Sequence, residues 1–404
     1  MADVAEAVAR RSYGKLLAFL AARHRDVAAA EDALSEAFAA ALESWPRTGP
    51  PDNPEVWLLT TARRKLIDAG RRSRSGAEAM PHLTMLGEEL AELAQTGSDI
   101  PDRRLALMFT CAHPAIDEAV RAPLMLQTLL GFDAAMIAQA FMVQPAAMGQ
   151  RLVRAKAKIR EAGIPFRVPE RFELASRLPP VLDAIYALFT EGWGNPASHR
   201  DFTGEGIWLG RLLVELLPDE PEALGLLALM LHAEARKAAR RNGMGSFVPL
   251  SEQDTSAWNS AMIAEAEENL RRAACFGMAG RFQLEAAIQS AHAARRLNGT
   301  TDWTAIERFY TGLMDLSPSP VIAVNHAVAL AEAQGFAVGL AALEAAAADH
   351  RLSDYQPYWA ARARLLEDAG NNAEAYAAYT RAIDLESDVA VQEFLTGKRD
   401  RLLH

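Results

Sequence analysis

The chain of 404 residues has little of several things, and each shortage excludes a class of protein. It has only two cysteines, Cys111 and Cys275, which lie far apart in the sequence. Two isolated cysteines exclude a disulfide framework and suit a reducing cytoplasm. No apolar run reaches the roughly 20 residues that a membrane-spanning helix needs, and the N-terminal residues lack the apolar core of a signal peptide. We therefore expect a cytoplasmic protein with no membrane partner.

Runs of β-branched residues are also scarce, whereas alanine and leucine are abundant. This composition predicts a nearly all-α fold. Half of the residues are apolar, so there is enough material for a substantial core. A chain of this length is expected to form two to four compact units, because single cores stop growing well below it.

The chain has no excess of positive charge, since its net charge is −10. Residues 1–170 contain 21 Lys+Arg and 21 Asp+Glu, whereas residues 171–404 contain 21 and 31, so the whole excess lies in the C-terminal part. A neutral N-terminal part with local basic clusters can bind DNA, while the acidic remainder would be repelled by it. The charge distribution predicts two separate tasks.

Changes in composition divide the chain into four segments. Residues 1–72 and 102–163 are each predicted to be compact and helical. Between them, residues 73–101 contain Gly, Ser, Pro and a cluster of Glu88, Glu89 and Glu92, which predicts an acidic linker with at most one short helix. Residues 164–404 are predicted to form a long helical array.

Residues 133–160 have the pattern of two helices joined by a tight turn. Asp133 is a candidate N-cap for the first helix, and Pro145 suits the first turn of the second. The inward stripe of the second helix is predicted to be Met148, Leu152, Ala155 and Ile159. The side chains able to donate to bases and phosphates face away from it, namely Gln150, Arg151, Arg154 and Lys158. A solvated basic face on an ordinary two-helix turn fits this window equally well.

Residues 28–45 form a predicted amphipathic helix whose buried stripe is Leu34, Phe38 and Leu42. The side chains expected outside it include Asp32, Ser35 and Glu36.

A second helix follows, with Asn53 as N-cap and Pro54 at its first position. Its inward side chains are predicted to be Leu59, Ala62, Leu66 and Ala69. Trp57 and several arginines on other faces suit melted DNA, in which bases stack and phosphates pair with arginine. A basic surface helix with one core tryptophan is the alternative.

The C-terminal stretch has a repeat signal. Eight positions match a tetratricopeptide (TPR) repeat, namely Trp359, Ala363, Leu366, Gly370, Ala375, Tyr379, Ala382 and Ile383. A looser copy precedes it, with Gly335 lying 35 residues before Gly370. TPR-like packing is expected here, and generic helix pairs in an Ala/Leu-rich region are the alternative.

Signatures of catalysis are absent from the sequence. Cys111 and His113 provide at most half of a metal site, and a buried cysteine beside a capping histidine is the simpler interpretation. No phosphate-binding loop, dinucleotide fingerprint or nucleophile elbow is present. We expect no enzyme activity, no metal and no cofactor.

The order of these motifs resembles that of bacterial RNA polymerase sigma factors. It runs from AEDALSEAF to NPEVWLLTTARRKLID, then a linker, then a helix-turn-helix that ends in QRLVRAKAKIREAG. It is most similar to the extracytoplasmic-function (ECF) group, which keeps only regions 2 and 4. The segments LMFTCAHPAI, GIPFRVPE and LPDEPEALGLLALML further resemble the ECF subgroup with a long C-terminal TPR-containing extension. The resemblance implies a region 2 helical bundle, a region 4 helix-turn-helix domain and a TPR-like helical array.

The resemblance also implies partners and site residues. The chain would bind core RNA polymerase at the β′ clamp and the β flap of the polymerase. The residues of this chain that would contact the clamp are Asp32, Ser35, Glu36 and Phe38. The −10 promoter element would be bound by Asn53, Trp57, Thr60, Arg63, Arg64 and Arg71. The −35 element would be bound by Ala147, Gln150, Arg151 and Arg154, with Lys156 and Lys158 on phosphates. The linker would thread the RNA exit channel. The extension would regulate activity in cis and would itself respond to a protein or small-molecule regulator.

One departure and two alternatives belong with this hypothesis. Ala146, Ala147 and Gly149 leave the start of the recognition helix with few polar side chains, so backbone and shape contacts would contribute more to recognition there. The first alternative is a helix-turn-helix regulator that binds duplex DNA without polymerase. The second is a TPR scaffold whose N-terminal half binds only protein.

Overall fold

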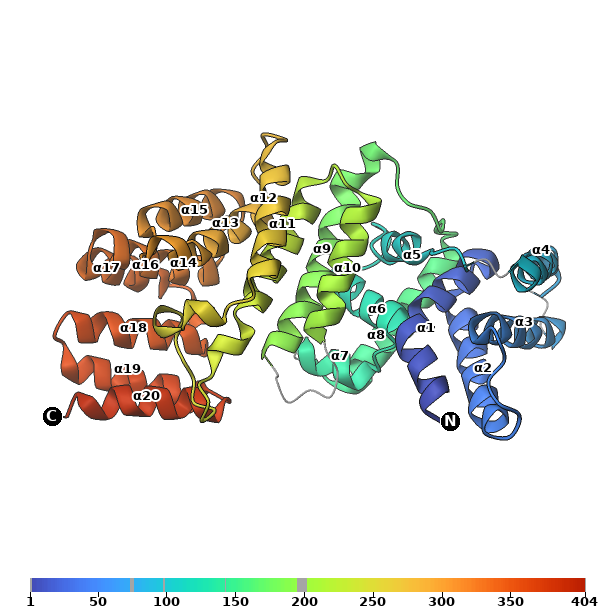
Figure 1. Cartoon of the computed structure of the whole chain (residues 1–404), viewed down its shortest axis with the longest axis horizontal. Coiled ribbons are helices and arrows are strands. Elements are labelled where there is room, and N and C mark those ends of the chain that lie inside the picture. The colour runs from blue at the N-terminus through green and yellow to red at the C-terminus, as the bar shows by residue number, and fades with distance from the viewer. Residues whose placement is uncertain (1, 73–75, 97–98, 142, 195–201, 404) are drawn as a thin grey trace. The chain divides into compact units, whose positions relative to one another are not determined.

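The computed structural model describes residues 2–72, 76–96, 99–141, 143–194 and 202–403, without the side chains of residues 2–11, 70–72, 76–82, 94, 139–140, 171, 191–194 and 202. Within this part of the chain every regular element is a helix, apart from one isolated bridge between Arg241 and Phe247. The all-α prediction is confirmed (Figure 1). The chain divides into two compact units, residues 1–206 and residues 207–404. None of the described helices is long and apolar enough to cross a membrane.

The first unit is built around its N-terminal helix. Its helices are α1 (Ala2–His24), α2 (Val27–Thr48), α3 (Pro54–Arg72), α4 (Gly76–Thr96), α5 (Arg104–Cys111), α6 (Glu118–Leu130), α7 (Ala134–Ala140), α8 (Pro145–Glu161) and α9 (Arg171–Gly194). All six consecutive residues 16–21 of α1 are buried, as expected of a helix that is surrounded on all sides. α1 packs against α2, α3, α4, α5 and α6, which joins the two predicted helical segments in one core.

The contact between α1 and α6 is unusually close. A Cβ atom on Gly14 would lie only 2.1 Å from the carbonyl oxygen of Leu129. The two backbones are so close here that only glycine fits at position 14. α9 adds to the same unit by packing on α5 and α6. There the buried guanidinium of Arg177 donates a 2.5 Å hydrogen bond to the carbonyl of Phe109. The first compact unit therefore continues beyond residue 163.

The segment 73–101 is more ordered than the sequence suggested, because it contains the helix α4 (Gly76–Thr96). The prediction of at most one short helix was wrong. Four leucines recur every three or four residues along α4 and are buried, namely Leu83, Leu86, Leu90 and Leu93. They hold α4 on α3 and α1, and Arg23 of α1 forms a bidentate ion pair with Glu89.

Two apolar residues predicted to face inward are exposed. The buried stripe of α2 is made largely of alanines, together with Leu34 and Trp45, and this rotates the helix so that 51% of Leu42 is exposed. Ala69, near the end of α3, is also exposed, whereas Leu59, Ala62 and Leu66 are buried as predicted. The predicted buried face of α2 was wrong at Leu42, because the alanines of this helix are buried in its place.

The predicted helix starts are confirmed by their capping bonds. The side chain of Asn53 accepts a 3.1 Å hydrogen bond from the amide of Val56 at the start of α3. Asp133 accepts bonds of 2.9 and 2.8 Å from the first amides of α7. In α8 the four side chains predicted to face inward are all buried, namely Met148, Leu152, Ala155 and Ile159.

The second unit is an array of helices in which chain neighbours pack together (Figure 1). Its main helices are α10 (Phe202–Leu216, which begins in the first unit), α11 (Pro221–Ala235), α12 (Ser260–Ala274), α13 (Arg281–Ala293), α14 (Arg295–Asn298), α15 (Trp303–Leu316), α16 (Pro320–Gln334), α17 (Phe336–Ala346), α18 (Gln356–Asp368), α19 (Asn372–Leu385) and α20 (Val389–Arg401). Short 3₁₀ turns are η1 (Lys237–Arg240), η2 (Leu250–Glu252), η3 (Thr255–Ala257) and η4 (His350–Leu352).

The segment with the repeat signal forms helix hairpins. α16 and α17 pair across Gly335, and α18 and α19 pair across Gly370. Both glycines have positive φ, 105° and 77°, which the tight turns require. Ala363, Ala375 and Tyr379 share one buried cluster between their helices. This packing fits the TPR-like arrangement, which itself stays a prediction.

Candidate nucleic-acid interface

The outer face of α2 has the acidic and aromatic side chains predicted to contact a protein partner. Asp32, Ser35 and Glu36 are exposed, and Glu36 forms an open ion pair of 3.0 Å with Lys65 of α3. Phe38 is half-buried and stacks on Tyr13, with ring centroids 6.4 Å apart. Burial and the carboxylates of Glu31 and Asp32 raise the pKa of the Tyr13 phenol. This face is negatively charged around a partly accessible aromatic pair.

α3 presents a mixed face of aromatic, hydroxyl and basic groups. Trp57 is half-buried and meets the buried Trp45 edge-on, with centroids 5.5 Å apart. Thr60 is half-buried and Arg64 is exposed. The side chain of Arg71 lies outside the described part of the chain. Asn53 is exposed but is already engaged as the cap of α3.

Arg63 does not share the exposure of its neighbour Arg64, because α4 lies against it. Its Nε donates a 2.5 Å hydrogen bond to the carbonyl of Leu83. A Cβ atom on Gly87 would lie 2.5 Å from its guanidinium, so Gly87 leaves the space that Arg63 occupies. In this conformation a DNA contact by Arg63 would require α4 to move.

The outward face of α8 is basic and open. Gln150, Arg151, Arg154 and Lys158 are exposed, and Ala147 is half-exposed. The Nε of Arg154 donates a weak 3.3 Å hydrogen bond to the carbonyl of Gln150 on the same helix. These side chains project from a helix whose opposite face is buried, the arrangement that major-groove recognition needs.

One edge of α8 is instead packed on α2. Lys156 forms a 2.5 Å ion pair with Glu31, and only 11% of the lysine side chain is exposed. Arg160, one turn further along, pairs with Asp26 at 3.1 Å. Lys156 was predicted to contact phosphates. In this conformation its ammonium group is instead paired with the carboxylate of Glu31.

Sequence reasoning missed two residues of this surface. Arg160 follows Lys156 by four positions and thus shares its face, a spacing that was visible in the sequence. Leu42 is exposed on the same solvent side of α2 as Phe38, from which it is separated by one helical turn. The sequence had no signal for that exposure, because an amphipathic pattern assigns a leucine to the interior.

The remaining candidate sites have little convergent chemistry. Cys111 is buried 3.6 Å from the hydroxyl of Thr128, and burial raises the pKa of its thiol to about 12. His113 accepts a hydrogen bond from the amide of Ala115 through Nδ1. Among the described residues, no three metal-ligating side chains lie close enough together to hold an ion.

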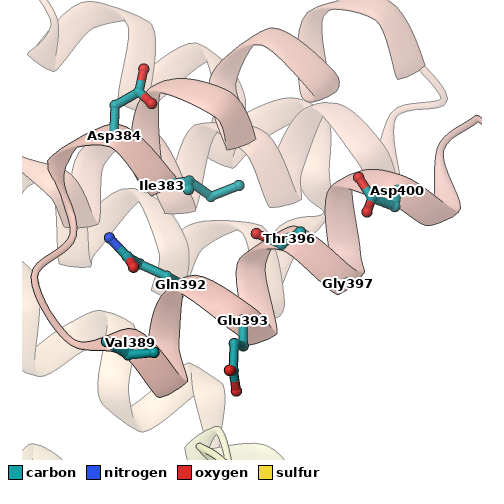
Figure 2. Close-up of a pocket in the computed structure, with 8 residues that line it drawn as sticks. All are labelled: Ile383, Asp384, Val389, Gln392, Glu393, Thr396, Gly397 and Asp400. Carbon is teal, nitrogen blue, oxygen red and sulfur yellow. The ribbon is translucent and has the colours of Figure 1, made fainter.

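A shallow groove of about 600 Å³ is lined by residues of α19 and α20. Figure 2 shows that the carboxylates of Asp384 and Glu393 point in opposite directions at its edges. These two carboxylates therefore do not meet on a common ligand.

Comparisons with known proteins bear on both units. Residues 8–76, which include most of α1 and all of α3, match the model of sigma-70 region 2. Residues 177–274 match a family of unknown function, DUF6596. An uncharacterized protein of Rhizobium meliloti (strain 1021) is 37% identical over 409 residues, covering 99% of this chain and 95% of the relative. No solved structure matches the chain.

Proposed function

We propose, from the match of residues 8–76 to sigma-70 region 2, that this chain is an ECF-type sigma factor. It binds bacterial core RNA polymerase, recognises the −10 and −35 elements of a promoter and initiates transcription. The observation that carries the proposal is the region 2 match over α1 to α3, the helices on which the acidic and the aromatic-basic faces lie.

In this proposal the acidic face of α2 contacts the β′ clamp of the polymerase. Asp32, Ser35 and Glu36 are exposed, Phe38 is partly accessible, and Leu42 adds an apolar side chain. An apolar centre with carboxylates around it suits a partner surface with basic groups, because charges at the rim steer association and the centre contributes most of the affinity.

The −10 element is assigned to α3. Trp57 and Thr60 lie beside Arg64 on a helix that starts after a polar turn. Aromatic and basic groups together favour melted strands, since stacking contributes about 1–3 kcal/mol per base and arginine neutralises phosphates. Arg63 joins this face once α4 is displaced, and Asn53 and Arg71 complete the assignment.

The −35 element is assigned to the outward face of α8, with α7 as the supporting helix of a helix-turn-helix. Gln150, Arg151 and Arg154 would reach base edges, while Lys158 would contact phosphates. Ala147 is small enough to allow close approach of the backbone. Lys156 becomes available to phosphates only when its ion pair with Glu31 opens.

Residues 73–101 would connect the two DNA-binding regions and residues 164–404 would regulate activity in cis, with the TPR-like helices as the contact surface for a regulator.

The test is run-off transcription with bacterial core polymerase on the DNA upstream of the chain's own gene. Full-length protein is compared with residues 1–206, since the first compact unit ends there. A product from either form supports the proposal, and the ratio between them measures whether the second unit restrains or assists transcription. No product and no core binding by either form would leave a duplex-binding regulator or a protein scaffold.

Charge reversal tests the polymerase-binding face. Asp32→Arg with Glu36→Arg should lower the affinity for core polymerase at least tenfold, because like charges then meet at the interface. The matched control is Asp384→Arg with Glu393→Arg, which makes the same change in charge on exposed side chains of α19 and α20. Equal affinities for the two double variants would refute the assignment of α2.

A further inference from the structure

The second unit contains a basic cluster although the unit as a whole is acidic. Residues 207–404 contain 18 Lys+Arg and 26 Asp+Glu, a net charge of −8. Six of the 18 basic residues lie in two short stretches, at positions 236–241 and 295–296.

The fold brings these two stretches together around a small apolar core. Ala235, Ala239, Trp258 and Ala293 form one buried cluster. η3 contacts both η1 and α14. Arg236 and Arg240 follow the two alanines directly in the chain, and Arg295 lies two residues beyond Ala293. Guanidinium groups that are about 60 residues apart in sequence therefore share one neighbourhood.

Arg236 and Arg295 have only neutral acceptors. Arg236 donates from Nε to the carbonyl of His232 at 3.3 Å and from its terminal nitrogen to the side-chain oxygen of Gln289. Arg295 donates to the carbonyls of Ser251 and Gln253, at 2.8 and 3.0 Å. Over the described residues no carboxylate forms an ion pair with either guanidinium.

Other arginines of the same unit are paired with carboxylates. Arg211 forms a bidentate ion pair with Glu265, and Arg281 pairs with Glu285 at 2.9 Å. Arg236 and Arg295 differ from these two arginines, although carboxylates outnumber basic groups in the unit.

The positive charges of the cluster also shift the pKa values of neighbouring groups. Burial, together with the charges of Arg240 and Arg295, lowers the pKa of Arg236 to about 10. Burial and the charges of Arg236 and Arg295 also lower the pKa of His292 to about 4. Positive charges held this close raise one another's free energy, and a bound anion would relieve that repulsion.

The side chain of Trp258 also suits an anionic ligand. The indole Nε1 of Trp258, a residue only 4% exposed, is a buried donor that has no acceptor among the described residues. The guanidinium of Arg295 lies over the ring of Trp258, 5.3 Å from its centroid. This stacking fixes the guanidinium plane and leaves its charge without an opposite partner.

We propose that Arg236, Arg240 and Arg295 form a binding site for a small ligand that bears a phosphate group. A phosphate has nearly two negative charges at neutral pH and three acceptor oxygens, so one group can bond to more than one guanidinium. A single carboxylate has one charge and two oxygens, and matches the cluster less well. The site belongs to the second unit and the proposed promoter and polymerase contacts belong to the first, so its existence does not depend on them.

Titration of the full-length protein with inorganic phosphate tests the proposal, with calorimetry for affinity and thermal unfolding for stabilisation. Ionic strength is held constant with chloride. Phosphate should bind with saturation and raise the midpoint of unfolding, because a ligand that binds only the folded state stabilises it. Succinate in a parallel titration distinguishes carboxylate from phosphate, and tighter binding of succinate would overturn the assigned ligand class.

Variants assign the site. Arg236→Gln and Arg295→Gln should each weaken phosphate binding at least tenfold. Arg295→Lys should weaken it less, because it keeps the positive charge and loses only the paired N–H donors of the guanidinium. Arg211→Gln is the matched control, because it removes the same charge from an arginine that already has a carboxylate partner; it should bind phosphate as the unaltered protein does. Stabilisation no greater than that in chloride, or unchanged affinity of Arg295→Gln and Arg295→Lys, would overturn the proposal.

Discussion

Lys156 of α8 and Glu31 of α2 lie 125 residues apart in the sequence and form a largely buried ion pair of 2.5 Å. The pair links the helix proposed to read the −35 element with the helix proposed to bind polymerase. A cation that would contact phosphates is thereby held by a carboxylate of the same chain. DNA contact by Lys156 and docking of α8 on α2 compete for one ammonium group.

Glu31→Gln is expected to lower the free energy of unfolding by about 1–2 kcal/mol, because the Lys156 ammonium would remain partly buried without its counter-charge. Chemical denaturation measures the loss. Glu36→Gln is the control on the same helix, since its ion pair with Lys65 is exposed and should contribute less than about 0.5 kcal/mol. A double-mutant cycle with Lys156→Met that finds no coupling would contradict the importance of the pair.

Gly14→Ala should destabilise the first unit by about 1–3 kcal/mol. The new methyl group would meet the backbone oxygen of Leu129 at 2.1 Å, and a backbone atom in a helix has little freedom to move away. Thermal or denaturant unfolding reports the change. The same substitution at Gly397 in α20 meets open space and should stabilise by up to about 1 kcal/mol, so equal effects at the two positions would refute the close approach of α1 and α6.

Gly87→Ala is expected to loosen α4. Its methyl group would lie 2.5 Å from the guanidinium of Arg63, which would have to leave its hydrogen bond to Leu83. Hydrogen exchange should show faster exchange of the amides of α4. Gly149→Ala serves as the comparison: its Cβ would meet only the Cβ of Ala134, at 3.8 Å, so it should stabilise by up to about 1 kcal/mol and leave α4 unchanged. Identical exchange in both variants would argue against the packing of Arg63 under α4.

The second unit should lose stability as the pH falls. The pKa of His292 is about 4 in the folded protein, against the ordinary 6.5, so the unfolded chain binds a proton at the higher pH. Stability is therefore full above pH 6.5 and declines as the pH approaches 4, by at most about 3 kcal/mol. His292→Gln should flatten this dependence, as measured by denaturation at a series of pH values. The exposed His350→Gln should not, and an unchanged slope in the His292 variant would contradict the assignment.

Arg151→Ala with Arg154→Ala should reduce transcription that depends on the −35 element by roughly tenfold or more, since one bidentate contact to a base contributes about 1–3 kcal/mol of discrimination. Run-off transcription on promoters with intact and scrambled −35 elements measures the effect. Arg103→Ala removes an exposed arginine of the same unit that lies outside α8, and its promoter profile should not change. An unchanged profile in the double variant would remove these two arginines from the −35 contact.

Local features could be predicted from the sequence because they depend on neighbours along the chain. The caps at Asn53 and Asp133 and the buried stripe of α8 depend on spacings of two to four residues, and the structure confirms them. α4 was underestimated because Gly, Ser and Pro at its start outweighed the leucine spacing that follows. The exposure of Leu42 was missed because the alanines of α2 take the interior positions.

By itself the sequence determined the helical class, the positions of most helices, the uneven distribution of charge and an order of motifs that resembles that of sigma factors. Only the tertiary structure decided which of the outward side chains are free to meet a partner. It placed Arg63 against Leu83 and Lys156 against Glu31, and it brought Arg236 and Arg295 into one cluster. The physical reason is that a side chain's charge and shape follow from its residue type, whereas its neighbours across the core depend on how distant helices pack.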